Sequence, residues 1–289
     1  MDSYLKLIGA IENNNLEKVE RLLEEGADLH VNGDWALRSA AANGHLEIVK
    51  RLLEQGADLH AENDDALREA ARNGQLEIVK YLVEQGPNLH AKNDKAIQSA
   101  ALNGHLEIVK YLVEQGANLH ADNDFALVLA AQKGYLEVVK YLLEQGASVN
   151  DRALQLAALQ GRLEVVKYLI EQGDNLHSKN DRALQLAAEK GYLEIVNFLV
   201  EQGADSNLIT EQMLIKLFTS YDLKIKKITP RLTSLLLKID LVKKSYRIPR
   251  RNEILSTYKK KVLSSLSILM YHLYYRPSGP GFFQAIGQI

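Results

Sequence analysis

One eight-residue segment recurs along the chain at nearly constant spacing. It reads NGHLEIVK from Asn43 and again from Asn103, and a degenerate copy, NNNLEKVE, begins at Asn13. Successive copies are 30 residues apart, except for one interval of 27 between Gly134 and Gly161. A period of about 20 to 50 residues is typical of repeat proteins, in which each unit buries its apolar surface against its neighbours. The chain is therefore expected to fold as a stack of small, similar units.

Each unit is predicted to form two short helices. In the first, Leu37, Ala40 and Ala41 lie on one face, and small alanines there allow helices to approach closely. Residues 46–53 supply the apolar stripe of the second helix, and a glycine such as Gly56 suits its C-terminal cap. An aspartate precedes the first helix in six units, and we expect its carboxylate to cap the helix N-terminus. These aspartates are Asp34, Asp64, Asp94, Asp124, Asp151 and Asp181.

The segment GHLEIVKYLVEQGANLHA, from Gly104 to Ala121, resembles the second helix and following loop of an ankyrin repeat. The resemblance covers residues 4–210 and implies an all-α solenoid of stacked helix pairs. The family's usual period is about 33 residues, and the three residues missing here fall where the family has its β-hairpin finger. Phe125-Ala126-Leu127-Val128 stands where the family has Thr-Pro-Leu-His. Such short units resemble variants found in giant viruses of amoebae and in intracellular bacteria.

The repeat spacing divides the chain into four regions. Residues 1–33 are expected to form an N-terminal capping repeat, and residues 34–210 six full repeats. A degenerate eighth repeat is expected over 211–229, followed by a basic helical segment over 230–289. The six full repeats are 34–63, 64–93, 94–123, 124–150, 151–180 and 181–210.

The net charge of −2 conceals an uneven distribution. Residues 1–207 hold 20 Lys/Arg and 33 Asp/Glu, whereas residues 208–289 hold 15 and 4. Two amphipathic helices are expected over 231–245 and 252–275. They could form a cap or hairpin on the last repeats, or dock a second protein such as a ubiquitin ligase. A third possibility is contact with an anionic membrane or a nucleic acid.

The sequence offers no pattern typical of catalysis or of a cofactor site. It contains no cysteine, which excludes disulfides and thiolate metal sites, and no phosphate-binding loop or His-Glu-x-x-His motif is present. One column of histidines recurs, but the spacing between stacked units separates them too widely to share a metal ion. We expect them to bond to the backbone of neighbouring loops. They are His30, His60, His90, His120 and His177.

These observations favour a non-enzymatic protein with no cofactor, no metal and no small-molecule substrate. No signal peptide or membrane-spanning run is evident, so an intracellular, cytoplasmic location and a monomeric state are expected.

The resemblance implies that a protein partner binds the concave side, which the first helices and loops form. Positions there vary between units, and the exposed aromatics Trp35 and Phe125 are candidate anchors. Trp35 could instead pack against the N-terminal capping repeat. The candidate partner-binding residues are Trp35, Arg38, Asp65, Arg68, Lys95, Gln98, Phe125, Val128, Arg152 and Arg182. The predicted function is a protein-interaction scaffold, with a host-directed adaptor acting through residues 230–289 as the alternative.

Overall fold

The computed structural model describes residues 2–210, 212–213 and 217. Its helices alternate between the first and the second helix of each pair. The first helices are α1 (Asp2–Glu12), α3 (Trp35–Asn43), α5 (Asp65–Arg72), α7 (Lys95–Asn103), α9 (Ala121–Lys133), α11 (Asp151–Leu159) and α13 (Arg182–Lys190). The second helices are α2 (Leu16–Glu24), α4 (Leu46–Glu54), α6 (Leu76–Glu84), α8 (Leu106–Glu114), α10 (Leu136–Glu144), α12 (Leu163–Glu171) and α14 (Leu193–Glu201). A short 3₁₀ helix, Ser206–Leu208, follows, and no strand occurs in these residues.

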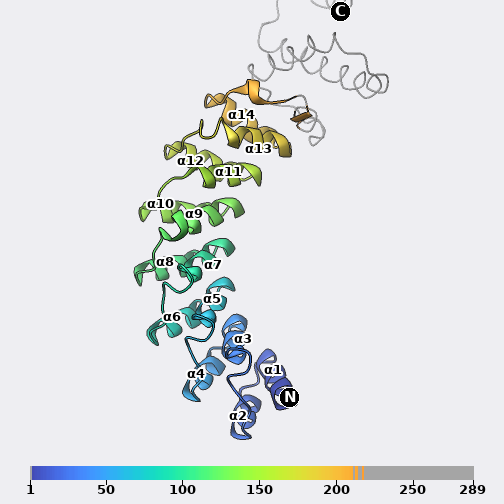
Figure 1. The fold of residues 1–289 in the computed structure, drawn as a ribbon, viewed down its shortest axis with the longest axis vertical. Helices are drawn as coiled ribbons and strands as arrows, with labels where there is room; N and C mark the ends of the chain where they lie inside the picture. The colour runs from blue at the N-terminus through green and yellow to red at the C-terminus, as the bar shows by residue number, and fades with distance from the viewer. Residues whose placement is uncertain (1, 211, 214–216, 218–289) are drawn as a thin grey trace, which may run out of the picture. The chain divides into compact units, whose positions relative to one another are not determined.

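The helix pairs stack in chain order, so the described residues form the all-α repeat solenoid predicted from the sequence (Figure 1). Successive first helices contact one another more extensively than successive second helices do. The alanine pairs at this contact, such as Ala40 and Ala41, are completely buried. Because the first helices lie closer together, they form the concave side of the array. We call the outward surface of the first helices the inner face.

The predicted capping role of the aspartates is wrong for most units. Asp34, Asp64, Asp94 and Asp181 have left-handed backbone, with φ between 51° and 58°, and none makes a side-chain capping hydrogen bond. Asp124 also has left-handed backbone, as the last of three such residues within α9. These residues turn the chain where the longer finger is missing, and the turn directs the carboxylate away from the first N–H groups of the helix. Asp and Asn tolerate this conformation better than most residues.

The loop that precedes Asp151, shortened by three residues at the end of the unit 124–150, is the exception. Asn150 has extended backbone and its side chain accepts a hydrogen bond of 3.0 Å from the N–H of Ala153. Deleting three residues has removed the left-handed turn, and Asp151 becomes the first residue of α11. The cap is therefore one residue earlier than the sequence pattern suggested.

In five pairs the turn glycine between the two helices is covered by a side chain from the next pair; these glycines are Gly44, Gly74, Gly104, Gly134 and Gly161. Gly104 has a φ of +78°, and a Cβ atom added to it would lie 2.6 Å from the ring of Tyr135. Gly116, after the second helix, has a φ of +93° but has open space around it. The first glycine is thus required by both backbone and packing, and the second by backbone alone.

We predict that Gly104→Ala destabilises the protein more than Gly116→Ala does. Both variants should lose about 1 kcal/mol from left-handed backbone strain, and Gly104→Ala should lose about 1 to 3 kcal/mol more from crowding against Tyr135. Urea unfolding followed by circular dichroism measures both. In a Tyr135→Ala background the two glycine variants should become similar, and a difference that persists there would contradict the packing explanation.

The unit that follows the shortened loop contains a poorly satisfied carboxyl group. Asp174 follows α12 at a position where other units have alanine, such as Ala57 and Ala117. Its Oδ2 atom is buried and has no hydrogen-bond partner. Burial raises the pKa of Asp174 to about 6; a hydrogen bond from the backbone of Asn175 lowers it, and the nearby charge of Asp151 raises it further.

We predict that Asp174→Ala stabilises the protein at pH 7.5. Because the folded-state pKa exceeds the unfolded value of 3.8, the wild-type protein loses stability as pH rises through this interval. A shift of this size corresponds to about 3 kcal/mol, which partial exposure reduces to about 1 kcal/mol. Urea unfolding at pH 7.5 and near pH 4 should show a gain that shrinks at the lower pH. A variant that is less stable at both values would contradict this account.

Three further observations complete the fold. No helix of the described residues is both long enough and apolar enough to cross a membrane. The first pair, α1 and α2, occupies the region expected to cap the array. The predicted eighth repeat over 211–229, apart from residues 212–213 and 217, and the predicted basic helices over 230–289 lie outside the described residues.

Candidate functional site

The surface of the second helices repeats the same polar contacts from unit to unit. The Glu47 carboxylate lies 2.7 Å from the Lys50 ammonium, and equivalent pairs occur on α6, α8, α10 and α12. The hydrogen bond to glutamate raises the pKa of Lys50, Lys110 and Lys140. Such exposed pairs contribute little stability individually, and their repetition makes this surface uniform.

The inner face differs from unit to unit, but several of its candidate residues are buried. The exposed fraction is 4% for Asp65, 2% for Gln98 and 1% for Val128. Asp65 accepts hydrogen bonds from Arg38, at 3.1 Å, and from Arg68, at 2.6 Å. These two arginines are therefore partly occupied by an internal carboxylate.

Arg38 and Gln98 also hold the loop that precedes their own helix. Arg38 Nη2 donates to the carbonyl of Asn32 at 2.6 Å, and Gln98 Nε2 donates to that of Asn93 at 2.7 Å. After the shortened loop the carbonyl of Asn150 accepts the N–H of Ala153 instead, and Gln155 Nε2 is left buried without a partner. This column of the repeat varies in sequence, yet its side chains also hold the loops in place.

Trp35 lies against the N-terminal helix. Its ring and that of Tyr4 on α1 meet edge to face, with centroids 6.3 Å apart. Trp35 therefore packs against the first helix pair, which is the alternative to the exposed partner-binding position considered from the sequence.

Phe125 has a different environment from Trp35. Lys95 Nζ lies 5.6 Å and Arg152 Cζ 5.0 Å from the centre of its ring, so cations from both neighbouring pairs flank it. Arg152 is exposed and no carboxylate of the described residues lies within ion-pair distance of it. Arg182, by contrast, lies 3.4 Å from Glu189. Phe125 and Arg152 are therefore the candidate residues most available to a partner.

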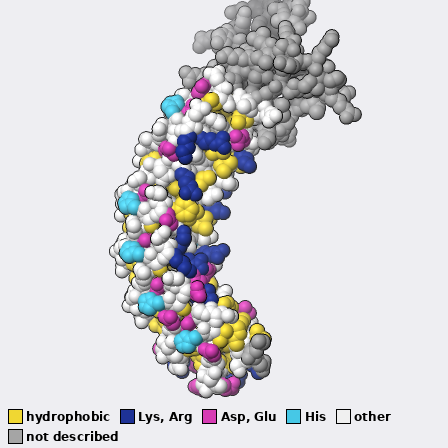
Figure 2. Space-filling view, viewed as in Figure 1, with side chains coloured by type: hydrophobic (Ala, Val, Ile, Leu, Met, Phe, Trp, Pro, Cys, Tyr) yellow, Lys and Arg dark blue, Asp and Glu magenta, His cyan; other side chains and the backbone are white. Residues whose placement is uncertain are grey.

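Four partly exposed leucines lie on the same first helix as Phe125 or on the next two, and they were not among the predicted residues. They are Leu129 on α9, Leu156 and Leu159 on α11, and Leu186 on α13. The signal that could have found them is a comparison along one column of the repeat. Where α9, α11 and α13 have Leu129, Leu156 and Leu186, the earlier first helices have Ser39, Glu69 and Ser99. Figure 2 shows hydrophobic side chains beside Lys and Arg side chains on this side of the array.

The histidine column makes a different contact from the one predicted. Each Nδ1 atom lies within hydrogen-bond distance of the aspartate four residues later, for example 3.0 Å from His90 to Asp94. That aspartate in turn accepts the N–H of Asn118, in the following loop, at 2.7 Å. The backbone contact is therefore made by the aspartate rather than by the histidine. Figure 2 shows the histidines along one edge of the array, and no group of three potential ligands in the described residues could hold a metal ion.

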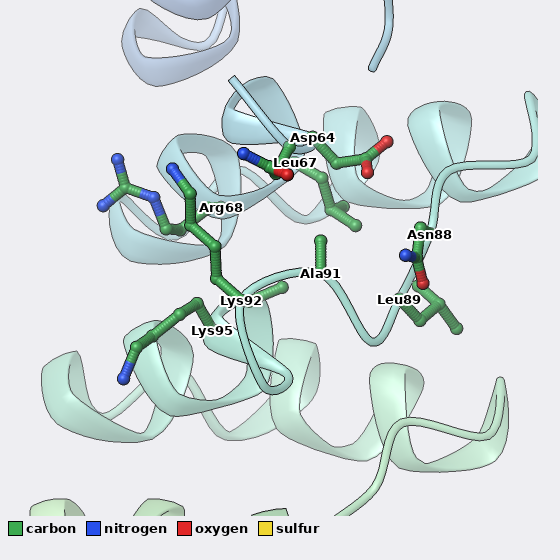
Figure 3. Close-up of a pocket in the computed structure, with 10 residues that line it drawn as sticks. Asp64, Leu67, Arg68, Asn88, Leu89, Ala91, Lys92 and Lys95 are labelled. Carbon is green, nitrogen blue, oxygen red and sulfur yellow. The ribbon is translucent and has the colours of Figure 1, made fainter. Parts of the chain in front are cut away.

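The loop at Pro87 lacks the aspartate contact. Proline has no N–H, so the carbonyl of Leu82 accepts the N–H of Gln85 instead. The N–H of Asn88 makes no hydrogen bond with Asp64, unlike its counterpart Asn118 with Asp94. A pocket of about 10 Å³, enough for about one water molecule, lies between the loop that contains Asp64 and the loop that contains Asn88. Figure 3 shows Arg68, Lys92 and Lys95 on one side of it and Asn88 and Leu89 on the other.

We predict that Asp94→Ala destabilises the protein more than Asp64→Ala. Both changes place alanine in left-handed backbone and remove a histidine contact, but only Asp94→Ala leaves the N–H of Asn118 without its acceptor. This difference should amount to about 1 to 2 kcal/mol. Chemical denaturation of the two variants measures it, and equal destabilisation would show that the aspartate contact to the next loop adds no stability.

Taken together, the structure defines a repeat solenoid with a uniform outer surface and a varied inner face. The family model for ankyrin repeats (3 copies) matches residues 7–93, 87–153 and 150–210. The chain therefore belongs to the ankyrin repeat family, as the sequence resemblance predicted. The crystal structure of the human ASB11 ankyrin repeat domain is similar, with 27% sequence identity and a TM-score of 0.59. The match covers 69% of this chain and 98% of the ASB11 chain. The comparison with curated proteins gives no match.

Ankyrin repeats generally serve as protein-protein interaction modules, and the match indicates such a module over residues 7–210.

Proposed function

We propose that this protein is a non-enzymatic scaffold that binds a partner protein on its inner face. One observation carries the proposal: side chains differ from unit to unit on the first helices, whereas the same Glu–Lys pair repeats along five second helices. If the side chains served stacking alone, those on the first helices could be as similar from unit to unit as those on the second helices. Variation along one face, beside a pair that repeats on five second helices, is what a specific partner surface requires.

Burial and internal contacts reduce the number of residues that we propose to touch the partner. Asp65, Gln98 and Val128 are buried, so they support the surface without forming it. Arg38 and Arg68 contribute through the part of their guanidinium groups that Asp65 leaves accessible. Phe125, Arg152, Lys95 and Arg182 remain as contact residues, and Trp35 lies against Tyr4 at the edge of the face.

The alternative is an adaptor in which the basic residues of 230–289 recruit a second protein or a membrane surface. The charge distribution supports it, because 15 Lys/Arg and 4 Asp/Glu lie in residues 208–289. In that arrangement the repeats would carry the basic segment and would not select the partner themselves.

We predict that Phe125→Ala combined with Leu129→Ala abolishes partner capture from a cell extract. Loss of two apolar anchors should weaken binding by about 2 kcal/mol or more, or at least about 30-fold. The matched control is Glu107→Ala with Lys110→Ala, which removes an exposed pair from α8. Mass spectrometry of proteins captured by full-length baits measures the outcome, and circular dichroism confirms that each bait is folded.

The baits are the wild-type protein, the Phe125/Leu129 variant and the Glu107/Lys110 control. A fourth bait, in which Lys259, Lys260 and Lys261 are changed to glutamate, distinguishes the scaffold from the adaptor. A partner lost only from the Phe125/Leu129 variant supports recognition by the inner face. A partner lost only from the glutamate variant supports the adaptor. A partner retained by every bait would contradict both.

A further inference from the structure

We propose that the inner face of α9, α11 and α13 binds an acidic segment of a partner protein that also carries leucine-like apolar side chains. This inference rests on the proposed function and specifies the chemistry of the partner. We call the surface formed by Phe125, Leu129, Leu156, Leu159 and Leu186 the apolar patch.

The apolar patch extends over three neighbouring helices. Phe125 and Leu129 are four residues apart on α9 and so lie on one side of that helix. Leu156 occupies the position on α11 that Leu129 occupies on α9, and Leu186 occupies it on α13. Successive first helices pack directly against each other, so these equivalent positions follow one another at the spacing of packed helices, about 8 to 10 Å. All five are partly exposed.

Stacking does not require leucine in this column. Ser39, Glu69 and Ser99 occupy it on α3, α5 and α7, and they are exposed to a similar extent as the three leucines. The helices pack on one another through the buried alanine pairs, which are present in every unit. A leucine in place of serine or glutamate at a partly exposed position adds apolar surface that the array itself leaves uncovered.

Cations without ion-pair partners surround the apolar patch. Arg152 stands at the start of α11, while Lys133 and Lys190 end α9 and α13. All three are exposed, and none has a carboxylate of the described residues within ion-pair distance. Near the patch in sequence, Asp122 is paired with Lys95 and Glu189 with Arg182, and Asp124 is buried against His120. Asp151 accepts a hydrogen bond from the hydroxyl of Ser178, which leaves its charge in place. The three exposed cations outnumber this carboxylate, so positive charge predominates around the patch.

Charge complementarity selects an acidic partner over the two occupants that this chain could supply. Residues 208–289 hold 15 Lys/Arg and 4 Asp/Glu, so this segment would bring positive charge to a positive rim. A second copy that docked by the same surface would place Arg152 near its own symmetry mate, which repulsion disfavours. A segment with carboxylates beside apolar side chains satisfies both components of the surface.

The dimensions of the patch fit a short helix or strand. Neighbouring packed helices lie about 8 to 10 Å apart, so the patch extends about 20 Å from α9 to α13. A helix of about 16 residues is about 24 Å long. Such a segment could place apolar side chains on all three helices while its carboxylates reach the surrounding cations.

The test is a selection of random peptides of about 16 residues, displayed on phage, against the immobilised full-length protein. We expect the enriched peptides to carry net negative charge and leucine-like residues, and their affinity to fall as salt concentration rises. Leu156→Ser and Arg152→Glu should each weaken binding of the enriched peptides about tenfold or more in fluorescence polarisation. The matched controls are Leu5→Ser, which removes an exposed leucine from α1, and Lys110→Glu on α8, and neither should change the affinity.

Enrichment of basic or neutral peptides, no enrichment, or equal binding by wild type and both patch variants would overturn the inference. So would a dimer, measured by sedimentation velocity, that Leu156→Ser dissociates, because a second copy would then occupy the patch. The inference fails alone, and the proposed function stands, if no acidic peptide is selected while a cellular partner still requires Phe125 and Leu129.

Discussion

The close contact between successive first helices is the interaction on which the array depends. It is possible because alanine pairs such as Ala40 and Ala41 stand where the helices meet, and these residues are completely buried. The apolar stripe of each second helix then closes the other side of the unit, with Ile48, Val49 and Leu52 fully buried. Since each pair packs on the pairs before and after it, stability is distributed along the chain as a series of neighbour contacts.

The loops between pairs show how a 30-residue unit manages without the three residues of the longer family period. Left-handed residues, such as Glu62, Asn63 and Asp64, reverse the chain in the available length. Where the geometry permits, the aspartate then holds the following loop, as Asp94 does through the N–H of Asn118. Two loops depart from this arrangement. In the loop of Pro87, the N–H of Asn88 makes no hydrogen bond with Asp64, and the shortened loop before Asp151 has no left-handed Asn-Asp turn. The poorly satisfied groups of Gln155 and Asp174 lie in the unit that follows this shortened loop.

The inner face combines structural and recognition positions, and the two can be separated only by burial and contacts. Arg38 and Gln98 vary between units, yet each also fixes a loop carbonyl. Leu129 and Leu156 look like framework residues because leucine is common throughout the repeat, yet they are partly exposed. A variable position is therefore not always a contact, and an apolar position is not always core.

The sequence by itself determined the helix pairs, the order of the units and the family. With a 30-residue period and fixed alanines and glycines, each unit buries its apolar face by stacking on its neighbours in chain order. Tertiary structure decided the roles of individual polar residues. The capping expectation failed because it used local helix chemistry, whereas the left-handed backbone of Asp34 and Asp94 directs their carboxylates to a loop 24 residues further on. Likewise, the burial of Gln98 and the exposure of Leu156 depend on neighbouring units, and no local pattern along a single unit encodes them.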